Sequence, residues 1–309
     1  MELKQQCSRV LMIEPSQFGF NAQTANSNAF QHRSSLSAEK IQQLAQEEFQ
    51  TFVAQLKAIG IDVHALKNTA KGPHPDAVFP NNWMSLHRDG TLVLYPMLTE
   101  NRRLERDPKI IDYLQANFDV HQIKDFTKRE LHGEILEGTG SMVFDHLHKV
   151  AYACLSERTS RGLFEEVCQF LDYDPVSFDA CDEHGNEIYH TNVMMTIGET
   201  YAIICTESIF NRKERKKVIE KLQATGHSVI PISFAQMRNF AGNALELINK
   251  KGERILVISQ SAIAVLTSHQ INALEKEVHL LPISIPTIER IGGGSVRCML
   301  AELFCPLTL

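Results

Sequence analysis

Three residues have side chains that together could perform nucleophilic catalysis. Cys298 follows three consecutive glycines inside an apolar segment, His190 begins another apolar segment, and Glu137 lies between Leu136 and Gly138. A thiol, an imidazole and a carboxylate can serve as nucleophile, general acid/base and orienting group of an activated-thiol site. Each residue alone is more typical of a structural position, because a cysteine among apolar residues usually behaves as a small buried hydrophobe.

Their spacing along the chain relates these residues to one another. Asn81 to Glu137 is 56 residues, Glu137 to His190 is 53, His190 to Asn243 is 53, and Asn243 to Cys298 is 55. A regular period of this length indicates repeated supersecondary units. If the units form a ring, the marked polar residues converge on its axis.

The repeats themselves consist of two apolar runs, predicted as a β-hairpin, followed by a helical pattern. We predict hairpins over 79–95, 136–155, 191–205 and 242–258, a single strand over 292–303, and helices over 160–171 and 207–225. The strand at 8–14 is expected to pair with the C-terminal strand. The sequence therefore predicts an α/β fold in which residues 1–309 form a single domain, a five-fold ring of strand-strand-helix units. The alternative is two α/β halves divided near residue 185.

Composition and charge exclude several classes of protein. The 309 residues are 43% hydrophobic and 22% charged, with a net charge of −6, which is globular and lacks the basic footprint of a nucleic-acid-binding protein. No leader-like or membrane-spanning apolar run occurs, so we expect a cytoplasmic location and no membrane partner. The seven cysteines are scattered without a C-x-x-C pair, which argues against a disulfide framework or a zinc ribbon.

Four motifs resemble those of the guanidine-modifying superfamily, in this order: Pro-Asp-Ala-Val-Phe-Pro-Asn-Asn at 75–82, Leu-Glu-Gly at 136–138, Leu-Ser-Glu-Arg-Thr at 155–159, and Gly-Gly-Gly-Ser-Val-Arg-Cys at 292–298. This superfamily includes dimethylarginine dimethylaminohydrolase, arginine deiminase, agmatine deiminase and the amidinotransferases. The resemblance implies the pentein fold, a five-bladed αβ-propeller with pseudo-five-fold repeats around a central active site. It implies a small amino-acid substrate and neither cofactor nor metal, and it is compatible with a homo-oligomer.

The resemblance also implies roles for individual residues. Cys298 would be the nucleophile, His190 the acid/base and Glu137 its partner. Arg158, helped by Arg102, would hold the α-carboxylate of the substrate. Asp76 would contact the amino-acid end of the substrate.

Two departures from the superfamily pattern concern specificity. Asn81 and Asn82 stand where the dimethylaminohydrolases and deiminases place carboxylates, and His190-Thr191-Asn192 replaces the His-x-Asp of arginine and agmatine deiminases. An amide can donate to the oxygen of a neutral ureido group, whereas a carboxylate only accepts and suits a guanidinium. We therefore predict a cysteine-dependent hydrolase that converts citrulline to ornithine, ammonia and carbon dioxide.

Other functions stay open at this point. Arginine deiminase, dimethylarginine dimethylaminohydrolase or amidinotransferase activity would require Asp76 or Glu134 to supply the missing charge. A catalytically inactive propeller acting as a binding module is the alternative from another class. His146 and His148 resemble a metal-binding pair, but we expect no metal because their turn would lie far from the axis. Residues 15–38, rich in amides and hydroxyls, are expected to be either a partial lid or a surface linker.

Overall fold

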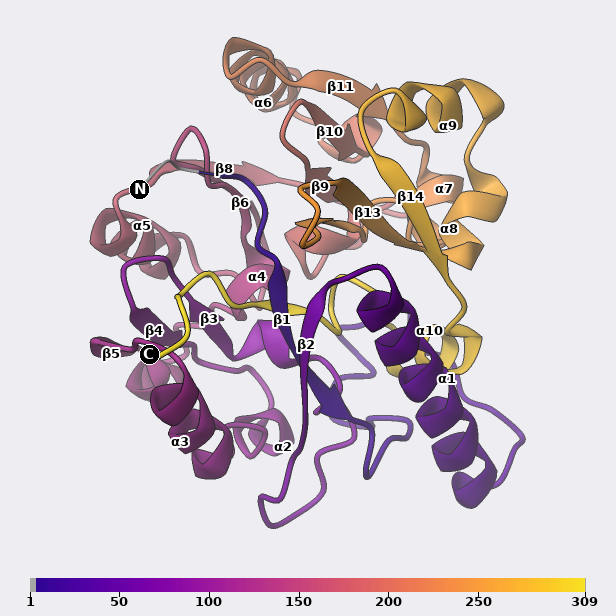
Figure 1. The fold of residues 1–309 in the computed structure, drawn as a ribbon. Helices are drawn as coiled ribbons and strands as arrows, with labels where there is room; N and C mark the ends of the chain where they lie inside the picture. Colours follow the sequence, from indigo (N-terminus) through magenta and orange to yellow (C-terminus); the bar gives the residue numbers. More distant parts are fainter. Residues whose placement is uncertain (1–3, 309) are drawn as a thin grey trace. The chain divides into compact units, whose positions relative to one another are not determined.

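The computed structural model describes residues 4–308, which form a mixed α/β fold of five three-stranded sheets (Figure 1). The predicted domain 1–309 also includes residues 1–3 and 309, which lie outside the described residues. Packing divides the described chain into two compact units. Unit 1 comprises the residues up to Gln6 together with Gly140–Ser284, and unit 2 comprises Cys7–Thr139 together with the residues from Ile285 on. The single-domain organisation and its closed ring stay predictions.

The five sheets share one strand order, which confirms the predicted repeat. In four of them an antiparallel hairpin is followed by a helical crossover to a third strand that pairs in parallel with the second strand. The fifth sheet pairs β1 antiparallel with β15, with Val10 opposite Glu302, and in parallel with β2. The N-terminal strand therefore pairs with the C-terminal strand, as predicted.

Two of the sheets belong to unit 2. The first consists of β1 (Arg9–Glu14), β2 (Asp62–Lys67) and β15 (Ala301–Glu302), and α1 (Ala38–Ala58) is its crossover helix. The second consists of β3 (Met84–Leu86), β4 (Thr91–Leu94) and β5 (Gln122–Asp125), with α2 (Glu100–Arg103) and α3 (Pro108–Asn117) between β4 and β5. Helix α1 also lies beside α10 (Pro286–Gly292), which ends just before the cysteine segment (Figure 1).

The other three sheets belong to unit 1. They are β6 (Val143–Asp145), β7 (Val150–Leu155) and β8 (Asp174–Asp179); β9 (Met195–Ile197), β10 (Tyr201–Ile204) and β11 (Ser228–Pro231); and β12 (Leu245–Ile248), β13 (Arg254–Ser259) and β14 (His279–Ile283). Their crossovers contain α5 (Arg161–Leu171), α6 (Arg212–Ala224), and the pair α8 (Gln260–Val265) and α9 (Ser268–Glu275). The helix predicted over 160–171 is thus confirmed, and that over 207–225 begins five residues later. Short helices complete the chain: α4 (Gly138–Ser141), α7 (Phe234–Arg238), and the 3-10 turns η1 (Pro80–Asn82), η2 (Thr127–His132), η3 (Thr191–Val193) and η4 (Thr206–Ser208).

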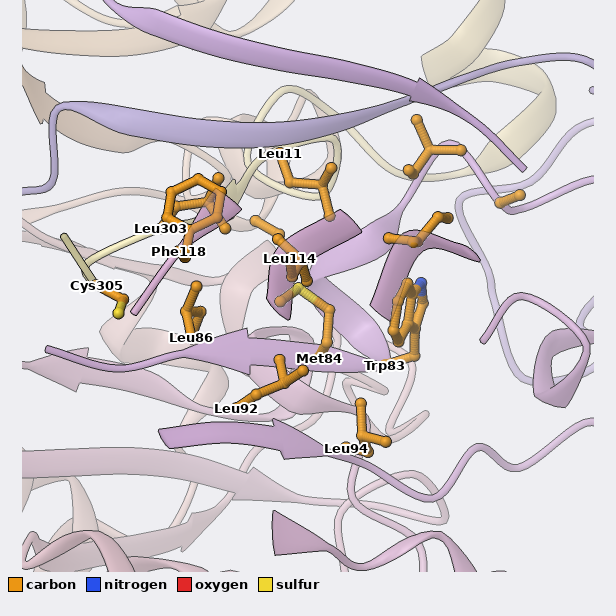
Figure 2. Packing of buried hydrophobic residues seen from close by; sticks show 14 of the residues in the cluster. Leu11, Trp83, Met84, Leu86, Leu92, Leu94, Leu114, Phe118, Leu303 and Cys305 are labelled. Carbon is orange, nitrogen blue, oxygen red and sulfur yellow. The ribbon is translucent and has the colours of Figure 1, made fainter. Parts of the chain in front are cut away.

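A hydrophobic cluster in unit 2 holds its two sheets together (Figure 2). Leu11 of β1 and Leu303 near the C-terminus pack with Trp83, next to η1, and with Leu114 of α3; all are fully buried. Apolar burial is the main stabilising contribution in such a core, and each side chain contributes about 1.5–3 kcal/mol. The η1 turn is therefore anchored by side chains from both ends of the chain.

The marked polar residues lie before the strands, which corrects the predicted hairpin starts. Asn81 is in the η1 turn before β3, His190 immediately precedes the η3 turn before β9, and Glu137 immediately precedes α4 rather than starting a strand. The turns are fixed by neighbouring repeats: Thr139 donates to the carbonyl of Asn81 (3.3 Å), and Asn243 donates to that of Asn192 (2.8 Å). Because the backbone of each turn is held by a hydrogen bond, the polar side chains on the turn have a defined direction.

Candidate active site

The Cys298 segment of unit 2 depends on its three glycines. Gly293 has φ +65°, and a Cβ on Gly292 or Gly294 would lie 2.8 or 2.9 Å from Cζ of Phe79. The Phe79 ring can approach this closely only because these residues have no side chain. Since Phe79 directly precedes η1, the contact brings the Cys298 segment next to the turn that bears the two asparagines. Cys298 itself is 3% exposed.

Glu137 of unit 2 is fully buried beside a buried guanidinium. Its Oε1 accepts from the backbone N–H of Leu98 at 3.0 Å, and its Oε2 lies 3.6 Å from Nη1 of Arg102. Arg102 also forms a bidentate ion pair with Glu105 at 2.8 and 2.9 Å and lies 3.9 Å from Asp76. Three carboxylates thus surround one buried guanidinium.

The pKa values of Glu105 and Arg102 are both raised in this charge cluster, which disfavours the ionised form of Glu105 and favours that of Arg102. Burial raises the pKa of Glu105 to about 7, against the lowering effect of its ion pair with Arg102. Burial alone would lower the pKa of Arg102, but the carboxylates of Glu105, Glu137 and Asp76 raise it above its usual value. Arg102 therefore stays charged at any physiological pH, and its single positive charge balances only part of the negative charge of the three carboxylates.

Arg102 also determines which way the amide of Asn82 points. Its Nη1 donates to Oδ1 of Asn82 at 2.9 Å, and a guanidinium has no acceptor, so the facing atom must be the amide oxygen. Nδ2 of Asn82 is then left as a buried donor, and it makes no hydrogen bond to any of residues 4–308; the same holds for both polar side-chain atoms of Asn81. Buried polar atoms without partners are costly, and they indicate a position where a ligand completes the hydrogen bonding.

Residues 15–38 lie against this part of unit 2. Asn21 donates to Oδ2 of Asp76 at 2.7 Å, and Thr24 lies 3.4 Å from the same oxygen. Asn28 donates to the carbonyls of Gly292 and Gly293, both at 3.3 Å. The amide-rich composition that stood out in the sequence thus provides buried hydrogen bonds to Asp76 and to the glycine segment. The lid stays a prediction, but the segment does pack on predicted site residues.

In unit 1, His190 and Arg158 contact the same aromatic ring. The His190 ring centroid lies 4.7 Å from that of Tyr189, and the Arg158 guanidinium carbon lies 4.9 Å from the Tyr189 centroid. Both residues are 2% exposed. The next residue, Thr191, donates to the carbonyl of Ser141 at 2.6 Å, which fixes the turn that follows His190. Cation–π contact stabilises a buried arginine while leaving its donors directed in the guanidinium plane.

The structure therefore brings the predicted residues together in two groups. In unit 2, Asp76, Asn82, Arg102 and Glu137 share one polar cluster, and in unit 1 His190 and Arg158 share a tyrosine. Their catalytic and binding roles stay predictions. The α-carboxylate role predicted for Arg102 would place a substrate in competition with Glu105, since that ion pair already occupies two of its donor groups.

Sequence reasoning missed three residues of these groups: Glu105, Tyr189 and Asn21. Glu105 follows Arg102 by three residues, a spacing that lets oppositely charged side chains pair on a helical turn. This spacing could have indicated the ion pair with Arg102. It could not have indicated that the pair is buried, because such pairs are common on protein surfaces.

The other cysteines are unsuited to nucleophilic attack at neutral pH. Burial raises the pKa of Cys154 and Cys168 to about 12 and that of Cys205 to about 11. Burial also raises the pKa of the remaining thiols outside the glycine segment, those of Cys7, Cys181 and Cys305. Because the thiolate is the reactive form, these six residues are expected to be inert.

A comparison with known protein families identifies the family of this chain. Residues 14–305 match the family described as N,N dimethylarginine dimethylhydrolase, eukaryotic. A search among curated proteins found no match to the sequence. No described helix is long and apolar enough to cross a membrane.

Solved structures share the fold at low sequence identity. The cyanobacterial arginine dihydrolase ArgZ, in its apo form, is 16% identical with a TM-score of 0.72, and the match covers 95% of this chain but only 40% of that one. A variant of the ArgZ N-terminal domain with a covalently bound reaction intermediate gives 16% and 0.72, covering 96% and 99% of the two chains. A cysteine variant of dimethylarginine dimethylaminohydrolase from Pseudomonas aeruginosa, in complex with citrulline, gives 14% and 0.62, covering 97% and 99%.

Proposed function

Because the chain belongs to the N,N-dimethylarginine dimethylhydrolase family, hydrolases of carbon–nitrogen bonds within the guanidine-modifying superfamily, we propose that it hydrolyses citrulline to ornithine, ammonia and carbon dioxide. The broader activity, hydrolysis of the guanidino group of an arginine-like amino acid, is that of the matched family. The narrower choice of citrulline comes from the residues that would contact the terminal group of the substrate.

The observation that carries this choice is the orientation of Asn82. Its amide oxygen is engaged by Arg102, and its Nδ2 is a buried donor without a partner within residues 4–308. A ureido oxygen is an acceptor and would satisfy this donor, whereas a guanidinium carries only donors on its nitrogens and would oppose it. Asn82 therefore favours a neutral ureido group over a guanidinium.

The proposed reaction is covalent. The Cys298 thiolate attacks the ureido carbon, His190 protonates the terminal nitrogen, and ammonia leaves, so that the carbon remains bonded to sulfur and to the ornithine nitrogen. Water that His190 deprotonates then attacks this carbon, the carbon–sulfur bond breaks, and the released carbamate decomposes to ornithine and carbon dioxide. The covalent intermediate solved in the ArgZ domain supports this route. No cofactor or metal takes part.

The remaining residues bind the substrate or hold the catalytic residues in place. Arg158, buried against Tyr189, is proposed to hold the α-carboxylate. Glu137 orients His190, while Arg102 holds Glu137 and Asn82 in place. The five sheets of one strand order support the predicted αβ-propeller, which would bring these residues to one axis.

A second candidate substrate is arginine. Asp76, Glu105 and Glu137 together exceed the positive charge of Arg102, so the cluster can accommodate another cation. The similarity to an arginine dihydrolase favours the same substrate. Hydrolysis of arginine at its terminal nitrogen would release ammonia and leave citrulline.

The experiment that tests the proposal is a substrate comparison. Purified protein is incubated with citrulline, arginine, agmatine and methylated arginines, and ammonia, ornithine and citrulline are measured. We expect ornithine from citrulline in an equimolar ratio with ammonia, and the largest kcat/KM for this substrate. Turnover of arginine alone, with citrulline inert, would overturn the citrulline assignment but not the hydrolase class. Turnover of none of them would overturn both.

A further inference from the structure

A cluster of metal-ligating side chains lies in unit 1, and none of its residues takes part in the proposed reaction. Asp145 ends β6, His148 lies in the turn between β6 and β7, and His227 directly precedes β11. One ligand atom from each of the three residues lies within 4.8 Å of the other two. The Asp145 carboxylate is 3.0 Å from Nδ1 of His148 and 3.9 Å from Nδ1 of His227.

The two ring nitrogens of His227 have different surroundings. Nε2 lies 3.2 Å from the carbonyl of Gly198, to which it can donate. Nδ1 lies 3.9 Å from Asp145, 2.9 Å from the Thr225 hydroxyl and 3.3 Å from the carbonyl of Leu222, so a metal ion bound at Nδ1 would replace the hydrogen bonds of this nitrogen. A histidine that ligates a metal with one nitrogen and donates from the other to a backbone carbonyl is the usual arrangement around bound metals.

The carboxylate of Asp145 is fully buried without an arginine or lysine within ion-pair distance in the part of the chain that the structure describes. It accepts from the backbone N–H of His148 at 2.9 Å and otherwise faces the two imidazoles. A buried carboxylate requires a compensating positive charge, which a metal ion or a protonated histidine can supply.

We propose that Asp145, His148 and His227 bind a zinc ion that links the β6–β7 turn to the start of β11. Two imidazole nitrogens and one carboxylate oxygen form a ligand set that zinc accepts in tetrahedral geometry, with the fourth position left for water. Zinc–ligand bonds of about 2.0 Å place neighbouring ligand atoms roughly 3.3 Å apart, so the ligand atoms that now lie within 4.8 Å of one another would move closer together on binding. The His148 side chain is 36% exposed and gives the ion a path of entry.

This site revises the expectation that the Asp-His-Leu-His turn binds no metal. The pair that the sequence suggested, His146 with His148, does not form, because Nδ1 of His146 bonds to the Tyr173 hydroxyl at 2.7 Å. The ligand that replaces it, His227, is 82 residues after Asp145 and could not be paired with it from spacing. The proposed zinc ion has a structural role and takes no part in the proposed catalytic steps.

The test uses the full chain, freed of metal by a chelator and titrated calorimetrically with zinc chloride. Because a catalytic thiol also binds zinc, the titration is made in wild type and in Cys298→Ala, and the other substitutions are made in Cys298→Ala. We expect one zinc per chain in Cys298→Ala, and binding at least tenfold weaker when His148→Ala or Asp145→Asn is added. His146→Ala is the matched control from the same turn and should bind zinc like Cys298→Ala alone.

A stability readout and a spectroscopic readout complete the test. Zinc should raise the melting temperature of wild type and of His146→Ala, but not that of His148→Ala, because a ligand that binds only the folded state stabilises it. Since His148 is exposed, this variant should fold even if Asp145→Asn does not. Cobalt(II) should give visible bands of nitrogen and oxygen ligation without a thiolate charge-transfer band. Equal zinc affinity in His148→Ala and His146→Ala, or loss of the zinc in Cys298→Ala alone, would overturn the proposal, as would no binding at millimolar zinc.

Discussion

Replacing Asn82 by aspartate should shift the substrate preference from citrulline toward arginine. The change is isosteric: Oδ1 keeps its place 2.9 Å from Nη1 of Arg102, and the buried Nδ2 donor becomes a second carboxylate oxygen. Toward arginine this adds a charge-assisted hydrogen bond, which contributes about 1.5–3 kcal/mol. Toward citrulline it removes a donor to the ureido oxygen and sets an acceptor against it.

The size of the shift follows from these contributions. At about 1.4 kcal/mol per factor of ten, the bond to arginine alone changes the preference by roughly 10- to 150-fold. The new carboxylate also joins Asp76, Glu105 and Glu137 around one guanidinium, and this repulsion places the expected shift at the lower end of that range.

The assay is the ratio of kcat/KM for citrulline to that for arginine, measured in wild type, Asn82→Asp, Asn192→Asp and the double variant. Asn82→Ala is the control, because it removes the donor without adding charge and should lower activity on citrulline with little gain on arginine. Partial non-additivity is expected if both asparagines contact one substrate group. A ratio that stays the same in all four proteins would refute the argument that these amides select the ureido group.

Three further predictions concern substrate binding by Arg158, the close packing of Gly138 and the ionisation of Glu105. Arg158→Ala should raise KM far more than it lowers kcat, because a carboxylate clamp binds ground and transition states about equally; the effect should vanish with a substrate that lacks the α-carboxylate, and additive losses would contradict the role. Gly138→Ala should lower the free energy of unfolding by about 1–3 kcal/mol in urea denaturation, since its φ is +46° and a Cβ would lie 2.4 Å from the carbonyl oxygen of Asn81; unchanged stability would contradict the close contact. Glu105 has a folded-state pKa of about 7, above its ordinary value, so its protonated form favours folding at low pH and this contribution is lost as pH rises toward 7. The stability of wild type relative to Glu105→Gln should therefore fall by up to about 3 kcal/mol between pH 4 and pH 8, and a difference independent of pH would show that the ion pair with Arg102 keeps Glu105 ionised.

The sequence predicted the hairpins because their strands are buried. Tyr201–Ile204 of β10, for example, is an uninterrupted apolar run, and all of its residues are buried. The third strand of each sheet was missed for the opposite reason. Gln122–Asp125 of β5 is largely exposed at the edge of its sheet, so it carries no apolar pattern, and only pairing with β4 makes it a strand.

Some features of the candidate site could be predicted from residue types, and others depend on packing. Cys298, His190 and Glu137 could be selected by chemical type and spacing along the chain. The orientation of the Asn82 amide could not, because it depends on the position of the Arg102 guanidinium 20 residues away, and that position depends on Glu105. Side-chain directions of this kind are decided by tertiary packing, which the order of residues alone does not determine.

In the proposed mechanism Cys298 forms the covalent bond to the substrate carbon. This role is tested by the rate of ammonia release from citrulline by Cys298→Ala, compared with Cys154→Ala, in which an inert buried thiol is removed. We expect Cys154→Ala to retain the wild-type reaction and Cys298→Ala to lose activity by about 10⁴-fold or more while remaining folded by circular dichroism. A Cys298→Ala protein that keeps a tenth of the wild-type rate would contradict the covalent mechanism.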